Sequence, residues 1–317
     1  MAYQQYANIS AADYNTLVGG DPITTTGYLN TVWATGGTTA GYGQTALANV
    51  TVGTQVYAAD WANLVNKTAN AASHQGTSIT SVTAPASGGT ITYLSAIPTN
   101  LTTIYAPRLN AATQGSTVAN SATILTPWAS IATFTHTVTF ANGDAARYFF
   151  NAGGQLKVTC AHANSTTGIN LLMNNLASNV GTVVLSSPSS GSITISSVSF
   201  NGITKIGGAG NSPTLLPNNG YYALTTSNAT VFTQTASTGP AGYLSTFIRV
   251  IAKSNGTVGT NGDTGNVVTI YTVWDEIPDG LTVGVGTTTT VTVQAPETTY
   301  LANTWGTITV SGSGTAI

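Results

Sequence analysis

The sequence predicts a mainly β protein, in which a small helical N-terminal module precedes an antiparallel β-sandwich or jelly-roll-like domain that carries one helix. Three observations lead to this fold class. Helical spacing of apolar residues is concentrated near the N-terminus. From Trp128 onward, about nine short strand-like runs alternate with turn clusters. Among them, Ile169 to Val180 carries apolar residues at intervals of three and four, and Gly181 ends this single helix.

Changes in composition divide the chain into three parts. Residues 1–75 are expected to form the helical docking module, 76–126 a connector, and 127–317 the β-sandwich domain. The connector is rich in Ser, Thr, Gly and Pro. Within it, Pro98 can occupy the first turn of a short helix with Leu101 on its apolar side. A helix this short needs neighbours, so we expect it to become ordered against the module or another chain.

The helical module should contain three helices. Ser10 can cap the first, which Gly19 ends. A short second helix covers Thr26–Ala34, and a third covers Ala58–Ala72. The glycine-rich piece Gly36–Gly43 lacks the Gly-Lys-Ser/Thr ending of a phosphate loop, so it is interpreted as a connecting loop.

The β domain should open with a hairpin. Ala132–Phe140 alternates apolar residues with threonines, and a turn at 141–144 leads into the strand-like run Ala146–Thr159. Leu244–Ala252 and Val267–Trp274 are apolar on both faces, which predicts central strands. The strands expected after the helix, which include these two central ones, are Thr182–Ser187, Ser192–Phe200, Thr230–Thr235, Leu244–Lys253, Asn266–Trp274, Thr287–Ala295 and Thr304–Val310.

The composition favours self-association. Charged residues make up 5% of the 317 residues, against about 25% in ordinary globular domains, whereas 42% are hydrophobic. The surface must therefore consist largely of hydroxyl, amide and glycine groups. A formal net charge of −2 leaves little repulsion between copies. Seven Lys and Arg residues spread along the chain form no basic stripe, so we expect no nucleic-acid binding.

The cysteine content and the hydropathy pattern indicate in which cellular compartment the protein folds. The single Cys160 excludes an intramolecular disulfide framework, and folding in a reducing cytoplasm is the simplest account. The N-terminus has neither the cationic start nor the apolar core of a signal peptide, and no run of about 18 apolar residues occurs. We therefore expect neither secretion by that route nor membrane insertion.

No catalytic, cofactor or metal site is expected from the acidic residues. The one local cluster is the stretch from Asp275 to Gly280, and its Pro-Asp-Gly ending is typical of a turn with solvated charges. The alternative is a weak calcium loop of Asp275, Glu276 and Asp279, joined by Asp263. An enzymatic pair of carboxylates is the third and least favoured interpretation.

Other reactive residue types also favour structural roles. His74, His136 and His162 lack metal-ligand spacing, and His136 is expected to be a hydrogen-bonded core histidine. Cys160 is interpreted as a small inward hydrophobe. No Gly-x-Ser-x-Gly elbow occurs. Arg147 and Arg249 are each placed in a strand whose other face is apolar, as exposed arginines or as partners of a carboxylate or a neighbouring subunit.

Three segments carry a family resemblance. They are Tyr148–Gln155 (Tyr-Phe-Phe-Asn-Ala-Gly-Gly-Gln), Gly220–Thr225 running into Val231–Gln234, and Gly41–Gln44 followed by Ala59–Leu64. This pattern resembles virion structural proteins of tailed bacteriophages, especially the contractile-tailed phages of cyanobacteria. The resemblance implies a class of protein and leaves the position within the particle open.

The resemblance and the composition together predict a non-catalytic virion component, such as a fibre, neck, tail or decoration protein. It would be made and assembled in the host cytoplasm, and would act as a homo-oligomer that docks to other virion proteins. Because fibres and spikes of this class are commonly trimeric, the resemblance implies three-fold symmetry. The alternative is a host-recognition fibre or adhesin module, in which Tyr221, Tyr222 and Tyr243 stack on a surface polysaccharide.

Overall fold

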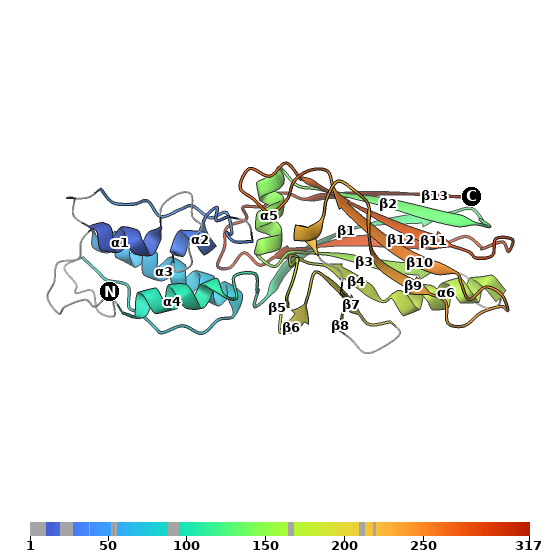
Figure 1. The fold of residues 1–317 in the computed structure, drawn as a ribbon, viewed down its shortest axis with the longest axis horizontal. Coiled ribbons are helices and arrows are strands. Elements are labelled where there is room, and N and C mark those ends of the chain that lie inside the picture. The colour runs from blue at the N-terminus through green and yellow to red at the C-terminus, as the bar shows by residue number, and fades with distance from the viewer. Residues whose placement is uncertain are drawn as a thin grey trace.

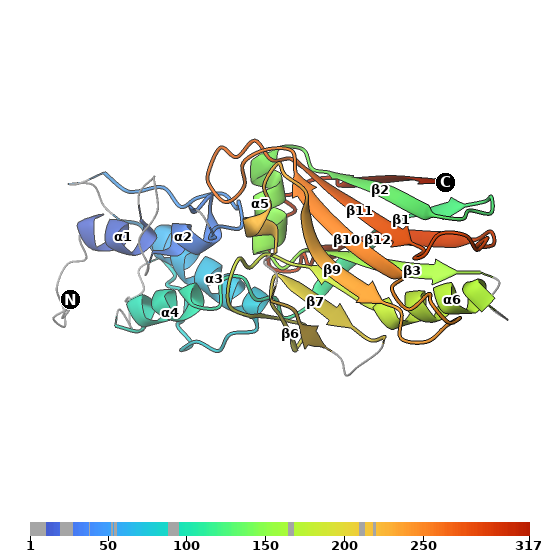
Figure 2. The same cartoon turned by 45° about the vertical axis from the view of Figure 1, so that its right-hand side comes forward.

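The molecule is elongated, with a helical region at one end and a β-sandwich at the other (Figure 1). The computed structural model describes residues 11–19, 28–37, 39–51, 53, 56–87, 95–163, 168–208, 213–217 and 220–317. Helix α5 (Gly143–Asn151) stands between the two regions, as Figure 2 shows from a second direction. The expected fold class, a helical N-terminal region followed by two packed antiparallel sheets with one helix among the strands, is confirmed.

In its described residues, the helical region contains four helices, α1 (Ala11–Val18), α2 (Leu29–Trp33), α3 (Ala58–Gln75) and α4 (Ala96–Tyr105). Tyr14 and Trp61 meet edge to face at 5.6 Å and join α1 to α3. Gly76 adopts the left-handed conformation that ends α3. The three helices expected before residue 76 are confirmed in the described residues, whereas Ser10 and Thr26 lie outside them.

Residues 76–126 contain two regular elements that pack on the neighbouring parts. Pro98 lies near the start of α4, as predicted, and Leu101 and Ile104 are buried against the other helices. Strand β1 (Gln114–Ile124), which the sequence did not predict, forms an edge of the larger sheet. Its residues are mostly exposed and polar on both faces, which removes the period-two signal.

The larger sheet has the strand order β1-β12-β3-β4-β7-β8. Its other strands are β12 (Thr287–Pro296), β3 (Gln155–His162), β4 (Thr182–Leu185), β7 (Ile203–Ile206) and β8 (Thr214–Leu215). The smaller sheet has the order β13-β2-β11-β10-β9. Its strands are β13 (Thr309–Ala316), β2 (Ile131–Thr139), β11 (Val267–Asp275), β10 (Phe247–Ser254) and β9 (Ala229–Thr235). The predicted central strands, β10 and β11, are both interior strands of this sheet.

Alternation of residue types places the core between the sheets. In β2 and β11, alternate residues such as Phe134 and Trp274 are buried and face the other sheet. Helix α6 (Gly168–Val180) packs against β3, β9 and β10 with its predicted apolar side. Most of the buried apolar residues form one contiguous cluster that runs from the helical region into the sandwich, and a smaller cluster joins Ala111 and Val184 to the hairpin at residues 193–200.

The predicted opening hairpin is wrong. β2 and β3 belong to different sheets, and residues 143–151 form α5 in place of the first half of a strand. The Asn142 side chain caps this helix by accepting a hydrogen bond from the Ala145 amide at 2.8 Å. Aromatic residues with high strand propensity hid this short helix, whose stability comes from being packed on all sides.

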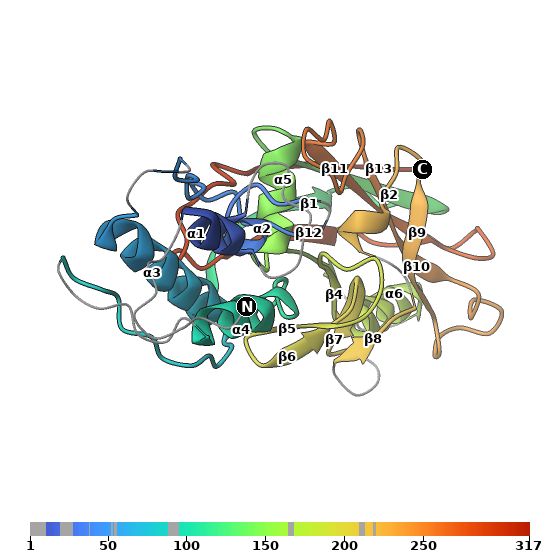
Figure 3. The same cartoon turned by 60° about the vertical axis from the view of Figure 1, so that its left-hand side comes forward.

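Two other predicted strands differ in detail. Residues 192–200 form the two-stranded hairpin β5 (Ile193–Ile195) and β6 (Val198–Phe200). This hairpin lies beside the segment that follows α4, to which Ile195 is bridged at Ala111 (Figure 3). The C-terminal strand begins at Thr309, so the predicted span Thr304–Val310 overlaps it by two residues only. The short 3-10 helix η1 (Tyr221–Ala223) lies at the start of Gly220–Thr225, one of the segments that carry the family resemblance.

Candidate functional site: a polar joint between helices and sandwich

A set of side-chain hydrogen bonds between segments distant in sequence lies where the helical region meets α5. We call this contact the joint, and define it as the loop at residues 34–44 together with the α5 residues that bind it. The loop contains Gly36, Gly41 and Gly43, all at positive φ. It is a connecting loop, as predicted, but it also provides backbone carbonyl groups as acceptors.

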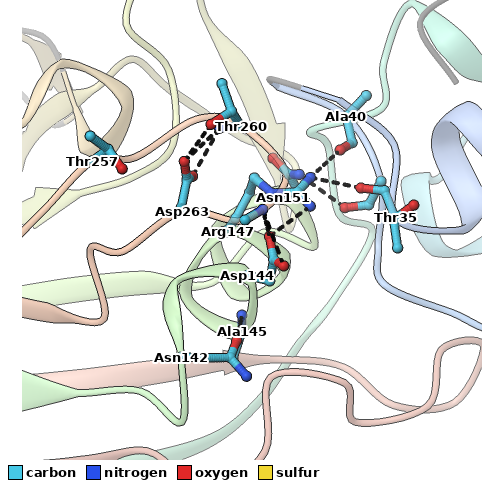
Figure 4. Close-up of polar contacts among 12 residues, drawn as sticks. Thr35, Ala40, Asn142, Asp144, Ala145, Arg147, Asn151, Thr257, Thr260 and Asp263 are labelled. Carbon is cyan, nitrogen blue, oxygen red and sulfur yellow. Dashed lines mark hydrogen bonds and ion pairs between the residues drawn. The ribbon is translucent and has the colours of Figure 1, made fainter. Parts of the chain in front are cut away.

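Arg147 is the centre of the joint (Figure 4). Its side chain is fully buried, and its Nη1 donates hydrogen bonds to the carbonyl oxygens of Thr35 at 2.7 Å and Ala40 at 2.9 Å. Nη2 forms an ion pair with Asp144 at 3.2 Å, one turn earlier in α5. The expectation of a strand arginine is therefore wrong, because Arg147 projects from a helix into a set of fixed oxygen atoms.

Asp144 extends the joint into the sandwich. Besides pairing with Arg147, its carboxylate accepts a hydrogen bond from the Gly262 amide at 3.2 Å. The neighbouring Asp263 accepts hydrogen bonds from the amide and hydroxyl of Thr260, so it closes its own loop (Figure 4). The buried cation is thus compensated by one carboxylate and two carbonyls, which reduces the cost of its desolvation.

Asn151, at the end of α5, binds the same loop from a second position. Its Nδ2 donates to the Gly41 carbonyl at 2.9 Å, and its Oδ1 accepts a hydrogen bond from the Tyr222 hydroxyl. Gly43 packs directly on the Tyr148 ring, where an added Cβ would lie 2.3 Å from a ring carbon. A side chain at residue 43 would therefore push the loop away from α5.

The loop is also held by segments from both sides of the joint. The Gln44 amide group exchanges two hydrogen bonds with the backbone of Ala302, at 2.8 and 2.9 Å. The Arg108 Nε donates to the Thr39 carbonyl at 3.0 Å, and the Tyr42 hydroxyl donates to the Arg108 carbonyl at 2.7 Å. These contacts bring residues separated by up to 258 positions together around one short loop.

Aromatic packing continues the joint into the sandwich core. Phe149 and Phe150 meet edge to face at 5.0 Å, and Phe150 stacks on Tyr221 at 4.1 Å. The segments at 41–44, 148–155 and 220–222 are far apart in the chain, yet all three contribute to this one contact. These are parts of the three segments that carry the resemblance described above.

Amide side chains clamp extended segments elsewhere in the helical region. Asn15, Asn30 and Asn100 each accept a backbone N–H and donate to the carbonyl of the same residue, which is Val50, Leu47 and Thr80, respectively. Each amide thus imitates one rung of a β ladder. A region with few charges is therefore held by neutral, directional bonds, which explains how so uncharged a chain fixes its loops.

The predicted acidic cluster does not form the alternative calcium site. Asp263 precedes the nine-residue β11 and Asp275 is its last residue, so the length of this strand, roughly 27 Å, lies between them. Among the described residues, no group of three or more His, Cys, Asp or Glu side chains could hold a metal ion. The turn itself is confirmed, but Glu276 is fully buried, so the expected solvated charge is wrong at this position.

The two oxygen atoms of the Glu276 carboxyl group differ in their hydrogen bonding. Its Oε1 accepts a hydrogen bond from the Leu281 amide at 3.0 Å, whereas its Oε2 has no partner in the described part of the chain. Burial is the main cause that raises the pKa of Glu276, and the nearby Asp279 adds to it. The carboxyl therefore stabilises the fold better in its neutral form.

The three histidines are buried and Cys160 is half-buried, each at a separate position. His162 contacts the Thr287 hydroxyl and Asn170, each at 3.1 Å. His136 is buried as expected, but neither of its ring nitrogens has a hydrogen-bond partner among the described residues. Burial lowers the pKa of His74 to about 4 and raises the pKa of the Cys160 thiol to about 12. Thus the thiol is protonated at neutral pH, which agrees with its interpretation as a small hydrophobe.

The tyrosines proposed to stack on sugars lie differently from one another. Tyr221 is fully buried, which contradicts its expected exposure, and the hydroxyl of Tyr222 is bound within the joint. Tyr243 is half-buried. Arg249 does lie in a strand with an apolar opposite face, and its guanidinium covers the Phe247 ring at 4.4 Å.

A half-open cavity of about 260 Å³ lies in the helical region, between α3, α4 and residues 77–82. Its described lining residues have aliphatic, hydroxyl or amide side chains, as Val65, Thr68 and Asn100 illustrate. Such a lining provides neither a general base nor a nucleophile with an activating partner.

Neither a family model, nor a curated protein, nor a solved structure matches the chain. The fold therefore defines it as a helical module joined to a two-sheet antiparallel sandwich. Within the described residues, no helix is both long and apolar enough to cross a bilayer.

Proposed function

We propose that the protein is a non-catalytic structural component of a tailed-phage virion, which assembles as a homo-oligomer and docks to other virion proteins. The observation that carries this proposal is the convergence of the three resembling segments at the joint. The buried Arg147 joins α5 to the loop of the helical region through hydrogen bonds. A virion component that bears mechanical load needs such a fixed connection between its two regions.

The elongated shape of the molecule supports separate roles for its two ends. The four N-terminal helices lie at one end of the long axis and the end of β13 lies at the other (Figure 1). The helical region would dock to the particle, while the sandwich projects. Four strands of the sandwich, β1, β2, β12 and β13, contain no Asp, Glu, Lys or Arg. Contacts that another protein makes with these strands would therefore depend little on salt.

Quantitative mass spectrometry of purified particles tests the proposal. The protein should copurify with virions through a density gradient, at a copy number that is a multiple of three, six or twelve for a tail part, or in the hundreds for a head part. Its detection in infected-cell lysates, together with its absence from purified particles, would overturn the proposal.

A host-recognition module that binds surface polysaccharide is the second candidate. One observation favours it: the outer face of the smaller sheet carries Tyr271 beneath Lys253 at 5.5 Å and Phe247 beneath Arg249 at 4.4 Å. Such half-buried rings could stack on sugars. On a glycan array, selective binding that Tyr271→Ala abolishes would support recognition, whereas a purely structural part should show no selective binding.

A further inference from the structure

We infer that β13 pairs edge to edge with β13 of a second copy, in antiparallel orientation, about a two-fold axis at Ser313. This inference rests on the homo-oligomeric part of the proposed function and names the surface that performs it. The partner is a second copy because the strand is self-complementary in charge, size and sequence, as the following observations show.

Among the described residues, no strand pairs with the outer side of β13, although β1 lies close to its inner face. β13 is the outermost strand of the smaller sheet, and its ladder with β2 runs from Thr309 to Ala316 without a register shift. The strand contains neither a charged residue nor a proline, and Ser311, Gly312 and Ser313 are all exposed. Edge strands of monomeric proteins are usually protected by charges, prolines, bulges or a covering segment, and β13 has none of the first three.

The other long edges are better protected. β9, at the opposite side of the same sheet, contacts α6 and is paired to β10 through a register shift. The Lys205 ammonium lies near this edge, 3.4 Å from the Gln234 side chain. β1, at the edge of the larger sheet, is interrupted at its start by a register shift between Gln114 and Thr117, and pairs in unbroken register from there to Ile124. Bulges of this kind discourage edge pairing.

The direction of the β13 backbone groups follows from its last hydrogen bond. The Ile317 amide donates to the Ile131 carbonyl at 3.0 Å, so residue 317 and every second residue before it point their backbone groups toward β2. The intervening residues, Val310, Gly312, Gly314 and Ala316, therefore point their N–H and C=O groups outward. These four residues form the free edge.

The sequence of the free edge is nearly palindromic about Ser313. In antiparallel pairing with a second copy, Gly312 lies opposite Gly314, Ser311 opposite Thr315, and Val310 opposite Ala316. Each outward residue then meets an outward residue, which yields about eight interchain hydrogen bonds. An isologous interface needs this kind of self-complementarity, and here it brings together no like charges.

Core packing explains why glycines occupy this edge. A Cβ at Gly312 would lie 2.5 Å from the Asn120 Oδ1 and from the His136 ring, and one at Gly314 would lie 2.8 Å from Ile124. The close approach of β1 thus requires small residues in β13. The same two glycines leave the outer edge without side chains that could obstruct a second strand.

A disulfide trap tests the register. The Ser313 pair would be a non-hydrogen-bonded pair with Cα atoms about 4.5 Å apart, which suits a disulfide. Mild oxidation of full-length Ser313→Cys should give a covalent dimer, while the native Cys160, a half-buried thiol, should not react. Thr233→Cys, at an exposed position of β9, is the matched control and should stay monomeric on a denaturing gel. Cross-linking of the control alone would overturn the inference.

Charged substitutions at Ser313 test whether the dimer forms without a covalent bond. Native mass spectrometry should give twice the chain mass for the wild type and for Thr233→Lys. It should give the monomer mass for Ser313→Lys and Ser313→Glu alone, because two like charges meet at the axis, and a heterodimer for their mixture. Circular dichroism should show that all variants are folded.

The outcomes separate this inference from the proposed function. A wild-type trimer, or a dimer that both charged variants retain, would overturn β13 pairing while leaving a homo-oligomeric virion part in place. A dimer in solution from a protein that purified virions lack would leave the pairing in place and overturn the virion role.

Discussion

The guanidinium of Arg147 and the carbonyl oxygen of Thr35 lie 2.7 Å apart, although 112 positions separate these residues in the chain. This bond joins α5, the helix that stands between the two regions (Figure 1), to the loop that follows α2. Because the guanidinium is fully buried, the two parts of the molecule cannot separate without exposing an ion pair and two carbonyl groups.

Arg147→Ala should lower the free energy of unfolding by about 3 kcal/mol, because Asp144 and two buried carbonyls lose their donor. Arg249→Ala is the matched control. Its guanidinium lies on the Phe247 ring at the surface of a strand, so its loss should cost less than about 1 kcal/mol. Urea unfolding followed by tryptophan fluorescence measures both. Equal losses would show that the joint contributes no more than a surface arginine.

Gly43→Ala should destabilise the protein by about 2 kcal/mol more than Gly53→Ala. Both glycines have positive φ, at 70° and 89°, so both substitutions strain the backbone by about 1 kcal/mol. Only the Cβ at residue 43 meets a ring, that of Tyr148, whereas the Cβ at residue 53 meets nothing within 4 Å. The difference between their thermal midpoints therefore measures the close approach of the loop to α5. Identical midpoints would contradict this contact.

Asn30→Asp should cost about 2 kcal/mol, since a carboxylate cannot donate to the Leu47 carbonyl and is itself buried. Asn63→Asp, on the exposed side of α3, should change stability by less than about 0.5 kcal/mol. Chemical denaturation at pH 7 compares the two. The loss at residue 30 should shrink at acidic pH, where the new carboxyl is protonated; a loss independent of pH would argue against the clamp.

Glu276→Gln should stabilise the protein increasingly as the pH rises from 4 to 8. The pKa of Glu276 is raised in the folded state, so its contribution to stability is complete below its ordinary pKa and is lost as the pH rises through the folded value. Glutamine keeps the acceptor for the Leu281 amide without the charge.

Glu297→Gln is the opposite-sign control for that series. Hydrogen bonds from the Thr299 hydroxyl and from the Thr298 and Thr299 amides lower the pKa of Glu297, so its contribution is present above its ordinary pKa and is lost as the pH falls. This substitution should be destabilising at pH 8, and its effect should shrink as the pH falls below the ordinary pKa of the carboxyl group. If both variants changed with pH in the same direction, the assigned environments would be wrong.

Residues with clear periodicity were predictable, and residues defined by distant contacts were not. The alternation in β2 and the spacing in α6 identified both elements, because each has one buried side. β13 was misplaced because Gly312 and Gly314 have low strand propensity, and its pairing with β2 determines its conformation.

The joint illustrates the same limit at the level of the site. Asn142 before Asp144 is the local signal that could have revealed α5, since it combines a cap with an acidic first turn. No sequence signal pairs Arg147 with Thr35 and Ala40, because main-chain oxygens are present at every position. The buried Glu276 was likewise hidden by a turn tripeptide that is usually solvated.

The acceptors of the Arg147 side chain in the loop are main-chain atoms, and this has a consequence for mutational tolerance. Exchanging the side chains of Thr35 or Ala40 leaves the bonding oxygen atoms in place, so these two hydrogen bonds do not restrict the residue type at either position. The arginine has no such freedom, since no other residue offers the same fork of donors. A saturation library across this region should therefore recover many substitutions at the half-buried Thr35, only small residues at the buried Ala40, and almost none at residue 147.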